Sequence, residues 1–306
     1  VIVYTVCKRL ASVKKERMGV AVKSIAVIND LSGFGRCSLT AAIPVISACG
    51  AQCCPLPTAV LSNQPGYDSY YCDDFTNKMP LFFAEWEKLH PSFDAILTGF
   101  IAGSRQGALI EQFIKTFQKE NTLLVVDPVM ADNGSIYDFY TPGMVQTVKQ
   151  LAMHADIVTP NLSELYLLAG EDCAGILTAD PDTLQQNAAE YAKRVLQQGV
   201  KTVIVSGIPA KDGQLANGIF TKDGAEFVLS GAMPGSFSGT GDLFVSVVTA
   251  KIVCGTPVQK AVEIATDFIY RSICRTIESS DGKPDYKGGI EFESFLHLLW
   301  EEQQHG

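Results

Sequence analysis

Basic residues are in the minority in this chain, and histidine is scarce. The 306 residues include 24 Lys and Arg against 33 Asp and Glu, with four His, for a net charge of -9 at pH 7. A nucleic-acid-binding protein usually presents a basic face, so this balance argues against nucleic acid as a partner. An anionic nucleotide remains compatible with it if a metal ion or backbone amides supply the positive charge.

Long apolar runs are also missing from the sequence. No run approaches the ~20 residues of a membrane-spanning helix, so we expect no membrane partner. The nine cysteines include no Cys-x-x-Cys pair, and with so few histidines a zinc site is not expected. Most cysteines lie in apolar company, which is typical of buried, reduced thiols in a cytosolic protein, and we therefore expect a cytoplasmic location.

The chain shows no internal repeat, low-complexity tract or linker. Its hydrophobic content of 47%, with 19% charged residues, is ordinary for a globular protein. Residues 1–17 mix a short apolar start with Lys and Arg in an order that does not fit a secretory signal. We expect them to be a disordered or non-native extension, followed by a single domain over residues 18–306.

From residue 23 onward, short apolar runs alternate with longer amphipathic segments. The apolar runs predict strands covered on both faces, at residues 24–29, 94–98, 123–127, 156–159 and 202–206. Helices are predicted at residues 104–119, with Ser104 as N-cap, and at 143–153, 182–198, 242–253, 258–277 and 291–302. Residues 216–230 have the pattern of a β-hairpin. The alternation predicts an α/β fold with a mostly parallel central sheet and helices on both sides.

Polar and glycine residues gather at the carboxyl ends of the predicted strands. These positions are 29–30, 98–99, 127–128, 159–161 and 206–207. In open α/β sheets the ligand crevice lies along this edge. We therefore expect residues far apart in the sequence to meet at one rim.

The run Gly239-Thr240-Gly241-Asp242 precedes an apolar stretch that is predicted to be a helix. Two glycines allow the backbone to turn tightly and bring its N–H groups close to an anion. The positive end of the helix dipole acts at the same place. Taken alone, the run supports two interpretations of Asp242 equally. It is either a general base beside a phosphoryl group in transfer, or an ordinary helix cap.

Two acidic segments have a structural and a functional interpretation. Asp127 and Asp132 lie on a strand-end loop, where two carboxylates suit a hydrated Mg²⁺ near phosphates, although an ordinary Asp-Pro turn is favoured for this segment alone. Asn161 and Glu164 have the spacing of a helix capping box. Their functional interpretation makes Glu164 a carboxylate near Mg²⁺ and Asn161 a phosphate contact. Both can hold, because both place polar groups at a helix N-terminus on the ligand rim.

Two loops give weaker signals. Residues 30–38 resemble the start of a dinucleotide-binding fingerprint, but Ser38 replaces the third glycine and no acidic residue follows at the expected distance. We reject that interpretation and expect only a close backbone approach to some ligand. Residues 61–67 form a polar loop with an aromatic residue, which fits either a pocket for a flat ligand or a surface turn.

Six segments, taken together and in this order, resemble pyridoxal kinases of the ribokinase-like superfamily. They are residues 29–35, 62–67, 97–100, 127–132, 159–164 and 239–242. The resemblance implies a three-layer αβα sandwich and an enzyme that transfers the γ-phosphate of ATP to the 5′-hydroxymethyl group of vitamin B6. Such a transfer depends on positioning and charge stabilisation, so the acidic net charge is acceptable once Mg²⁺ and amides supply positive charge.

The resemblance also implies a role for individual residues. Asp242 resembles the general base, and Gly239, Thr240 and Gly241 resemble the anion hole. Mg²⁺ would be held, directly or through water, by Asp127 and Glu164. The nucleotide side would comprise Asp132, Thr159, Asn161, Ser206 and Gly207. The pyridine substrate would meet Asn29, Asp30, Ser32, Asn63, Gln64, Tyr67 and Phe100. The family commonly uses a monovalent cation such as K⁺, which the sequence does not locate, and a homodimer is expected from the resemblance alone.

The chain departs from the family at several of these positions. Gln64-Pro65 stands where many pyridoxal kinases carry His-Thr, so position 64 cannot titrate and position 65 offers no hydroxyl or N–H. Phe100 replaces a frequent tyrosine, and Gly207 replaces a second hydroxyl residue. These changes leave open the preference among pyridoxal, pyridoxamine and pyridoxine.

Two other functions compete with this hypothesis. A hydroxymethylpyrimidine (phosphate) kinase of thiamine synthesis has the same fold and a similar flat substrate, but its usual N-terminal loop differs from residues 30–35. A catalytically silent nucleotide or B6 sensor is the alternative from another class. The retention of Asp242 with both glycines argues against it.

Overall fold

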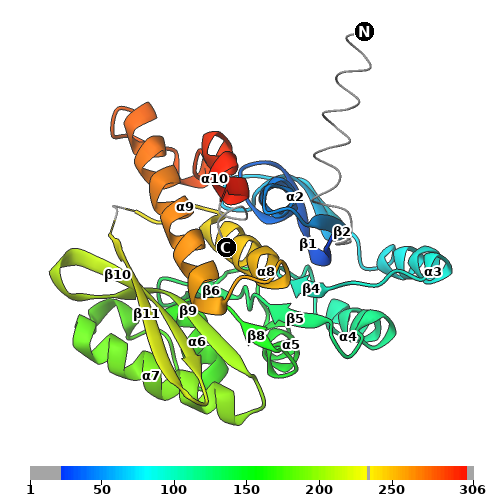
Figure 1. Cartoon of the computed structure of the whole chain (residues 1–306), viewed down its shortest axis with the longest axis horizontal. Helices are drawn as coiled ribbons and strands as arrows, with labels where there is room; N and C mark the ends of the chain where they lie inside the picture. The colour runs from blue at the N-terminus through cyan, green and yellow to red at the C-terminus, as the bar shows by residue number, and fades with distance from the viewer. Residues whose placement is uncertain (1–21, 233–234, 302–306) are drawn as a thin grey trace, which may run out of the picture.

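A nine-stranded sheet forms the centre of the described chain, which comprises residues 22–232 and 235–301 of a computed structural model (Figure 1). The strands lie in the order β11-β10-β9-β8-β5-β4-β1-β2-β3. Their bounds are β1 (Ser24–Phe34), β2 (Gln52–Asn63), β3 (Cys72–Asp74), β4 (Ala95–Thr98), β5 (Leu123–Val126), β8 (Ile157–Val158), β9 (Thr202–Pro209), β10 (Gln214–Thr221) and β11 (Gly224–Gly231). The six strands from β9 to β2 pair in parallel, and the pairings of β3, β10 and β11 at the edges are antiparallel. A separate ribbon joins β6 (Ala131–Asp132) to β7 (Ser135–Ile136).

Helices cover both faces of this sheet and complete three layers (Figure 1). One core lies against α3 (Met79–Leu89), α4 (Arg105–Phe117), α5 (Pro142–Met153), α6 (Leu162–Ala169) and α7 (Pro181–Gln197). The opposite core lies against α2 (Ser38–Ala48), α8 (Thr240–Val253), α9 (Val258–Ser279) and α10 (Leu296–Glu301). Successive residues of β1 alternate between the cores, Ile25 facing one and Ala26 the other. A strand covered on both faces therefore needs an apolar residue at every position.

The predicted strands and hairpin are confirmed. They correspond to β1, β4, β5, β8 and β9 and to the pair β10–β11, with β1 extended to Phe34. Helices α4, α5, α7, α8 and α9 also match their predicted segments. Strand β2 was not predicted, because Pro55 and Pro57 within it are typical of edge strands and not of a central strand. Both prolines lie in the part of β2 that pairs with β1 alone, since β3 pairs only with residues 59–61, so no second neighbour requires their missing N–H groups.

Two local predictions are wrong. Ser104 precedes α4 but makes no side-chain capping bond in its helical backbone conformation. The helix predicted at residues 291–302 is only the six-residue α10, preceded by the 3-10 turn η4 (Glu293–Phe295). The backbone N–H of Glu291 donates to Thr276 Oγ1 of α9 at 2.7 Å. This tertiary contact ties the start of the predicted segment to α9.

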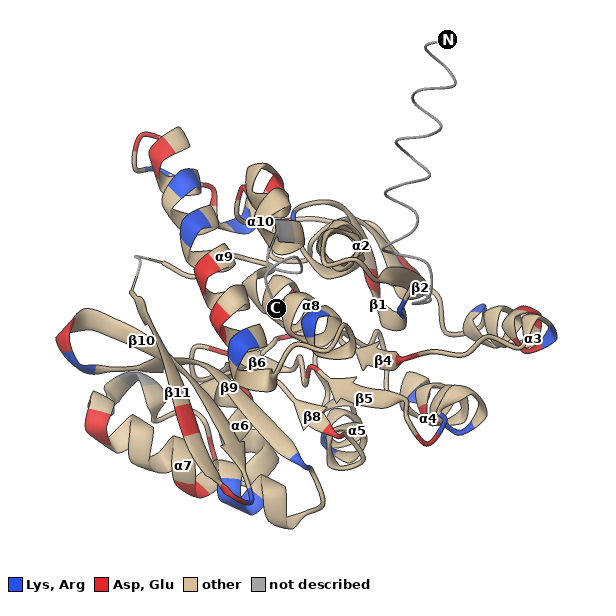
Figure 2. Cartoon of the chain, in the orientation of Figure 1, with Lys and Arg blue, Asp and Glu red and all other residues tan. Residues whose placement is uncertain are grey.

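Three features that the sequence raised concern the whole chain: membrane spans, cysteines and surface charge. In the described part of the chain, no helix is both long and apolar enough to cross a membrane. The cysteines described there are not uniformly buried, since Cys72 is exposed. Both signs of charge are mixed along the outer helices α3, α7 and α9 (Figure 2). The prediction for residues 1–17 lies outside the described residues.

Candidate active site

A cavity of about 1140 Å³ opens at the rim where the carboxyl ends of β5 and β8 meet the start of α8. This is larger than the roughly 300–1,000 Å³ of a typical single-ligand pocket. Its wall combines residues from β1, from the loops after β5 and β8, from β9 to β11, and from α8 and α9. The space therefore suits two ligands side by side, at the edge where the sequence placed the polar residues.

Asp242 lies on the wall as the third residue of α8. Its Oδ1 accepts a hydrogen bond from Asn29 Nδ2 at 2.9 Å, and the backbone N–H of Ser38, the first residue of α2, also donates to the carboxyl. The interpretation of Asp242 as an ordinary cap of its own helix is wrong, because Gly239 occupies the N-cap position without a side-chain cap. Burial raises the pKa of Asp242 to about 6, with the hydrogen bonds from Ser38 and Asn29 opposing that rise. Such a carboxyl can accept a proton near neutral pH.

Gly239 and Gly241, which precede Asp242, differ in why each position is occupied by glycine. Gly239 has φ of 80°, and a Cβ there would lie 2.0 Å from the carbonyl oxygen of Arg36, so only glycine fits. Gly241 has an ordinary backbone, and a Cβ built on it would meet no described atom within 4 Å. Thr240 donates its hydroxyl to the carbonyl of Phe237 at 3.1 Å, which fixes the turn. The face over Gly241 is therefore open to a ligand.

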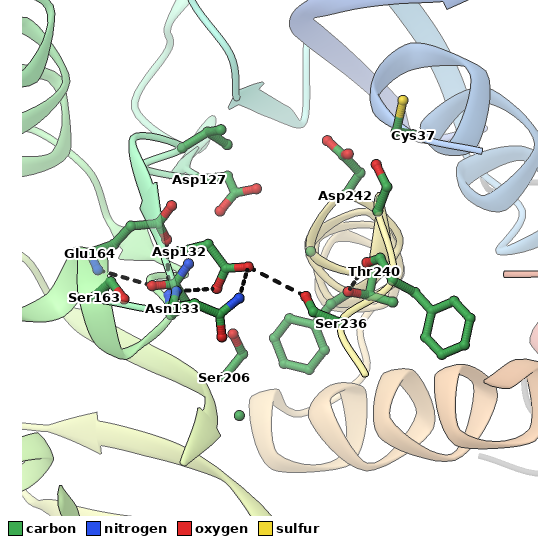
Figure 3. Close-up of a pocket in the computed structure, with 18 of the residues that line it drawn as sticks. Cys37, Asp127, Asp132, Asn133, Ser163, Glu164, Ser206, Ser236, Thr240 and Asp242 are labelled. Atoms are coloured by element: carbon green, nitrogen blue, oxygen red, sulfur yellow. Dashed lines mark hydrogen bonds between the residues drawn. The ribbon is translucent and has the colours of Figure 1, made fainter. Parts of the chain in front are cut away.

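Asp127 follows β5 and is buried in the wall. Thr159 Oγ1 donates to its Oδ1 at 3.1 Å. Burial raises the pKa of Asp127 to about 8, and the negative charge of Asp242 adds to the rise. Figure 3 shows the Asp127 and Asp242 carboxyls extending from opposite sides of the pocket.

Glu164 forms the capping box that the sequence predicted with Asn161. The backbone N–H of Asn161 donates to Glu164 Oε2 at 2.9 Å, and the N–H of Glu164 donates to Asn161 Oδ1 at 3.0 Å. The N–H of Met130 donates to the other carboxylate oxygen at 3.2 Å. Burial, and next the charge of Asp127, hold the pKa of Glu164 well above its usual range. With both oxygens engaged, Glu164 suits an indirect contact to a cation better than a direct one.

The electrostatics of this region fit a divalent cation. Asp127, Asp132 and Glu164 lie near one another in the pocket (Figure 3). Among the described residues of the wall, Lys287 is the one Lys or Arg. Within residues 22–232 and 235–301, no three His, Cys, Asp or Glu side chains form a metal cage. A Mg²⁺ held by one or two carboxylates, by waters and by substrate phosphates needs no such cage. Its positive charge would also lower these pKa values, which burial raises.

All five residues predicted for the nucleotide side lie on the cavity wall. They are Asp132, Thr159, Asn161, Ser206 and Gly207. Asp132 accepts from the backbone and side chain of Asn133, both at 2.9 Å. Gly207 adopts φ of 69°, and its N–H donates to Asn217 Oδ1 at 3.0 Å. The predicted positions are brought together here by the parallel order of β5, β8 and β9.

The residues predicted for the pyridine substrate divide into two groups. Asp30, Gln64 and Phe100 line the cavity. Four others lie outside the described wall, namely Asn29, Ser32, Asn63 and Tyr67. Ser32 is fully buried and donates to Asp30 Oδ2 at 2.8 Å, while Tyr67 donates to Asp285 Oδ2 at 2.8 Å. These side chains support the wall, because their polar atoms already bond other protein groups.

Several wall residues were missed from the sequence. They include Cys37, Tyr137, Phe139, Asn217, Ser236, Tyr286 and Lys287. Cys37 lies within the loop of residues 30–38 that the sequence singled out, and Ser236 precedes the glycine run by three residues, so both lay close to recognised segments. Burial raises the pKa of Cys37 to about 12, so its thiol stays neutral. Tyr286 and Lys287 carry no local signal, since they reach the site only through the path of the chain after α9.

Comparisons with known proteins agree with this geometry. A family model described as phosphomethylpyrimidine kinase matches residues 80–286. The crystal structure of a candidate phosphomethylpyrimidine kinase from Bacteroides thetaiotaomicron, solved with pyridoxal, is 37% identical, covers 91% of this chain and 96% of its own, and has a TM-score of 0.83. A pyridoxine/pyridoxal/pyridoxamine kinase of Bordetella avium is 26% identical over 79% of this chain and 82% of that relative. Pyridoxal kinase from Leishmania donovani, in complex with ADP and pyridoxamine, shares the fold at 22% identity, covering 90% of this chain and 95% of its own, with a TM-score of 0.78.

Proposed function

We propose that this chain, which belongs to the phosphomethylpyrimidine kinase family, phosphorylates vitamin B6. Its likeness to pyridoxal kinases and its three-layer ribokinase-like fold are confirmed. The reaction would transfer the γ-phosphate of ATP to the 5′-hydroxymethyl group of pyridoxal, pyridoxamine or pyridoxine. The observation that carries this proposal is the carboxyl of Asp242 beside the open backbone of Gly241, at the start of α8. A proton acceptor and an anion-stabilising helix end then meet at one point.

Asp242 acts as the general base in this proposal. Its carboxylate takes the hydroxyl proton as the substrate oxygen bonds to phosphorus, while the bond from phosphorus to the leaving ADP oxygen breaks. The backbone N–H groups of residues 239–241 and the α8 dipole stabilise the charge on the transferring group. Asn29 holds the Asp242 carboxylate through its 2.9 Å hydrogen bond, and Asp242 lines the cavity.

Mg²⁺ would be held by Asp127, with Glu164 acting through a water because its two oxygens already accept backbone N–H groups. When bound, the ion supplies positive charge to the phosphates. On the nucleotide side, Thr159, Asn161 and Ser206 offer polar groups along one rim. Asp132 and Gly207 lie on the same part of the wall. A monovalent cation such as K⁺ remains an expectation from the resemblance.

The pyridine ring would lie between Asp30, Gln64 and Phe100. Phe100 stacks edgewise on Phe139, with ring centroids 5.5 Å apart, which gives the pocket a rigid aromatic wall. Asp30 is buried, and its Oδ2 accepts a hydrogen bond from Ser32 at 2.8 Å. This combination of a flat apolar wall and a buried acceptor suits a planar heterocycle with a polar substituent.

A hydroxymethylpyrimidine kinase is the second candidate, because the matching family model carries the phosphomethylpyrimidine kinase description. Both substrates are flat heterocycles with a hydroxymethyl group, so the same base and anion hole serve either. The test is a kinase assay with Mg-ATP across pyridoxal, pyridoxamine, pyridoxine and hydroxymethylpyrimidine, with the products identified by mass spectrometry. Phosphorylation of the B6 compounds at higher kcat/KM supports the proposal. A clear preference for the pyrimidine overturns it, and no turnover of any compound would indicate a sensor.

A further inference from the structure

The segment Asp285–Gly289, which includes the 3-10 turn η3 (Tyr286–Gly288), lies where two loops of the site meet. One is the substrate loop, residues 62–69, which begins at the end of β2. The other is the anion-hole loop, residues 235–239, which leads into α8. Tyr286 and Lys287 of the segment line the cavity together with Gln64 of the substrate loop. No motif of the sequence covers this segment.

The segment bonds the substrate loop through three side-chain contacts, one of which is the ion pair between Lys287 Nζ and the exposed Asp68 Oδ1 at 3.2 Å. Gln64 Nε2 donates to the carbonyl of Lys287 at 3.0 Å, while Gln64 Oε1 accepts from the backbone N–H of Gly66 at 2.6 Å. Tyr67 donates its hydroxyl to Asp285 Oδ2 at 2.8 Å. Both ends of the buried Gln64 amide are thus occupied by backbone groups. Gln64 fastens the loop and does not serve primarily as a hydrogen-bonding partner for a ring.

The same segment bonds the anion-hole loop. The backbone N–H of Ser238 donates to the carbonyl of Tyr286 at 3.0 Å. The Tyr286 ring packs on Phe237 with centroids 4.8 Å apart. A Cβ on Gly235 would lie 2.0 Å from the Tyr286 ring, so the loop approaches this ring as closely as glycine allows. The position of Tyr286 therefore limits the position of the residues that precede Gly239.

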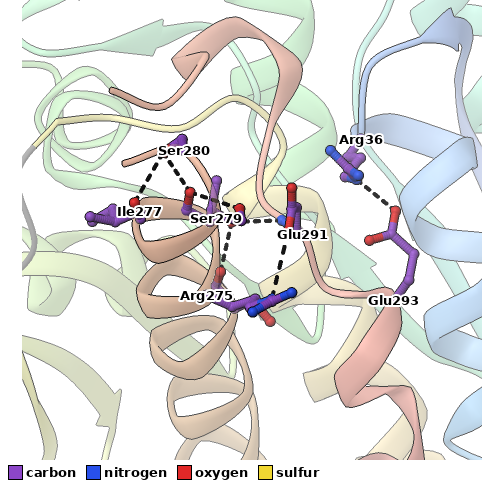
Figure 4. Close-up of polar contacts among 9 residues, drawn as sticks. Arg36, Arg275, Ile277, Ser279, Ser280, Glu291 and Glu293 are labelled. Carbon is purple, nitrogen blue, oxygen red and sulfur yellow. Dashed lines mark hydrogen bonds and ion pairs between the residues drawn. The ribbon is translucent and has the colours of Figure 1, made fainter. Parts of the chain in front are cut away.

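Asp285 stabilises the segment through a hydrogen bond within it, and contacts with Arg36 and the residues that follow hold the segment in place. Asp285 Oδ1 accepts from the backbone N–H of Lys287 at 3.0 Å. The backbone N–H of Arg36 donates to the carbonyl of Gly288 at 3.3 Å, and the Arg36 side chain pairs with Glu293 at 2.6 Å. Figure 4 shows this pair beside the Arg275–Glu291 contact, which ties the following residues to α9. The segment is thus fixed on the side away from the cavity.

We propose that Asp285 is a positioning residue, and that the Asp285–Gly289 segment couples the substrate loop to the anion-hole loop. When the pyridine ring of the substrate holds the substrate loop in place, the Asp285–Gly289 segment also holds in place the backbone amides around the phosphoryl group. The coupling favours the substrate hydroxyl over water as the phosphoryl acceptor, because the anion hole is ordered best when the ring site is filled. The consequence for catalysis rests on the proposed function, whereas the mechanical coupling does not.

The first test measures amide hydrogen exchange in the ligand-free protein, which requires no activity. Asp285→Ala removes both side-chain bonds of the brace and is expected to speed exchange in residues 62–69 and 235–240 alike. Tyr67→Phe removes one hydroxyl and is expected to speed exchange in residues 62–69, by about three- to tenfold for one lost hydrogen bond. Tyr71→Phe is the matched control, because its exposed hydroxyl has no hydrogen-bond partner among the described residues. Unchanged exchange at residues 235–240 in Asp285→Ala, with Tm within about 2 °C of the parent, overturns the coupling.

The second test measures steady-state kinetics and the share of ATP hydrolysed without transfer. Asp285→Ala and Tyr67→Phe are expected to raise the KM for the B6 substrate about three- to tenfold, to leave the KM for ATP within twofold, and to raise the hydrolysed share. Tyr71→Phe should match the parent in all three. Equal changes in both KM values, or an unchanged hydrolysed share, overturn the catalytic part of the inference. If the parent protein phosphorylates none of the four alcohols, the proposed function fails, while the exchange experiment still decides the coupling.

Discussion

Asn29 of β1 donates a hydrogen bond from Nδ2 to Oδ1 of Asp242 at 2.9 Å, across 213 residues of sequence. The Oδ1 of Asn29 accepts from the backbone N–H groups of Asp30 and Phe100, at 3.0 and 2.9 Å. The amide therefore has one orientation, with its donor toward Asp242. A Cβ on Gly99 would lie 2.7 Å from Asn29 Nδ2, so the backbone at Gly99 packs the amide from the other side.

Asn29→Asp keeps the acceptor and removes the donor. We expect kcat to fall about tenfold or more, because a charge-assisted hydrogen bond to the base is lost and a like charge is added. The acid limb of the pH–kcat profile should move to higher pH, since a neighbouring carboxylate raises the pKa of Asp242. A profile that superposes on that of the parent would show that Asn29 does not set the state of the base.

Asp242→Asn removes only the proton acceptor. We expect kcat to fall about 10²- to 10⁴-fold, the usual contribution of a general base, while the Kd for ATP stays within a few-fold. In the parent, activity should decline as the pH falls through about 6, because the base is then protonated. That limb should disappear from the residual activity of the variant. Near-normal kcat in the variant contradicts the assignment, and calorimetric titration with ATP serves as the folding control.

Gly239→Ala and Gly241→Ala form a matched pair. At Gly239, the left-handed backbone and the 2.0 Å approach to the Arg36 carbonyl should cost about 3 kcal/mol or more of unfolding free energy. At Gly241, an ordinary helical position with no described atom within 4 Å, alanine should leave the unfolding free energy equal or higher by up to ~1 kcal/mol. The same methyl should still lower kcat, because it would stand over the amides that face the phosphoryl group. Denaturant unfolding and steady-state kinetics separate the two effects, and unimpaired activity in Gly241→Ala would remove this turn from the anion hole.

The buried carboxyls predict how stability depends on pH. Burial raises the pKa of Asp242 to about 6 and that of Asp127 to about 8, so the folded protein holds these protons more tightly than the unfolded chain does. The stabilisation is complete below the ordinary carboxyl pKa and is lost as the pH rises through about 6 and then about 8. The Tm of the protein without Mg²⁺ should therefore fall from pH 5 to pH 9. Asp127→Asn should flatten the upper part of this fall, and Mg²⁺ with ADP should reduce it. Parallel profiles for parent and variant would contradict the assignment, as measured by differential scanning fluorimetry.

The candidate site could be predicted from the sequence where its residues follow buried strands. Asp127 and Thr159 directly follow β5 and β8, and Ser206 lies within β9 opposite Asn161, so the parallel order of these strands brings them to one rim. The capping box of Asn161 and Glu164 was also correct, because its chemistry is local to one helical turn. These features depend on short-range spacing and on one general rule of sheet topology.

The sequence could not show which polar side chains face the cavity and which support it. Asn29 and Tyr67 were expected to meet the substrate, yet their hydrogen bonds go to Asp242 and Asp285, each more than 200 residues away. Within the helix expected at residues 291–302, the structure has an α-helix only at Leu296–Glu301, and the N–H of Glu291 donates to Thr276 Oγ1 of α9. Long-range partners leave no periodic trace in the sequence.

The sequence by itself determined the α/β alternation, the strand-end carboxylates and the glycine run before Asp242, because apolar periodicity and backbone sterics act between neighbours. Only the tertiary structure decided the rest. It placed Asn29 behind the base, turned Gln64 toward the backbone of Lys287, and brought Tyr286 between the two loops of the site. Those choices depend on where the chain returns after α9, and packing against distant segments fixes that path.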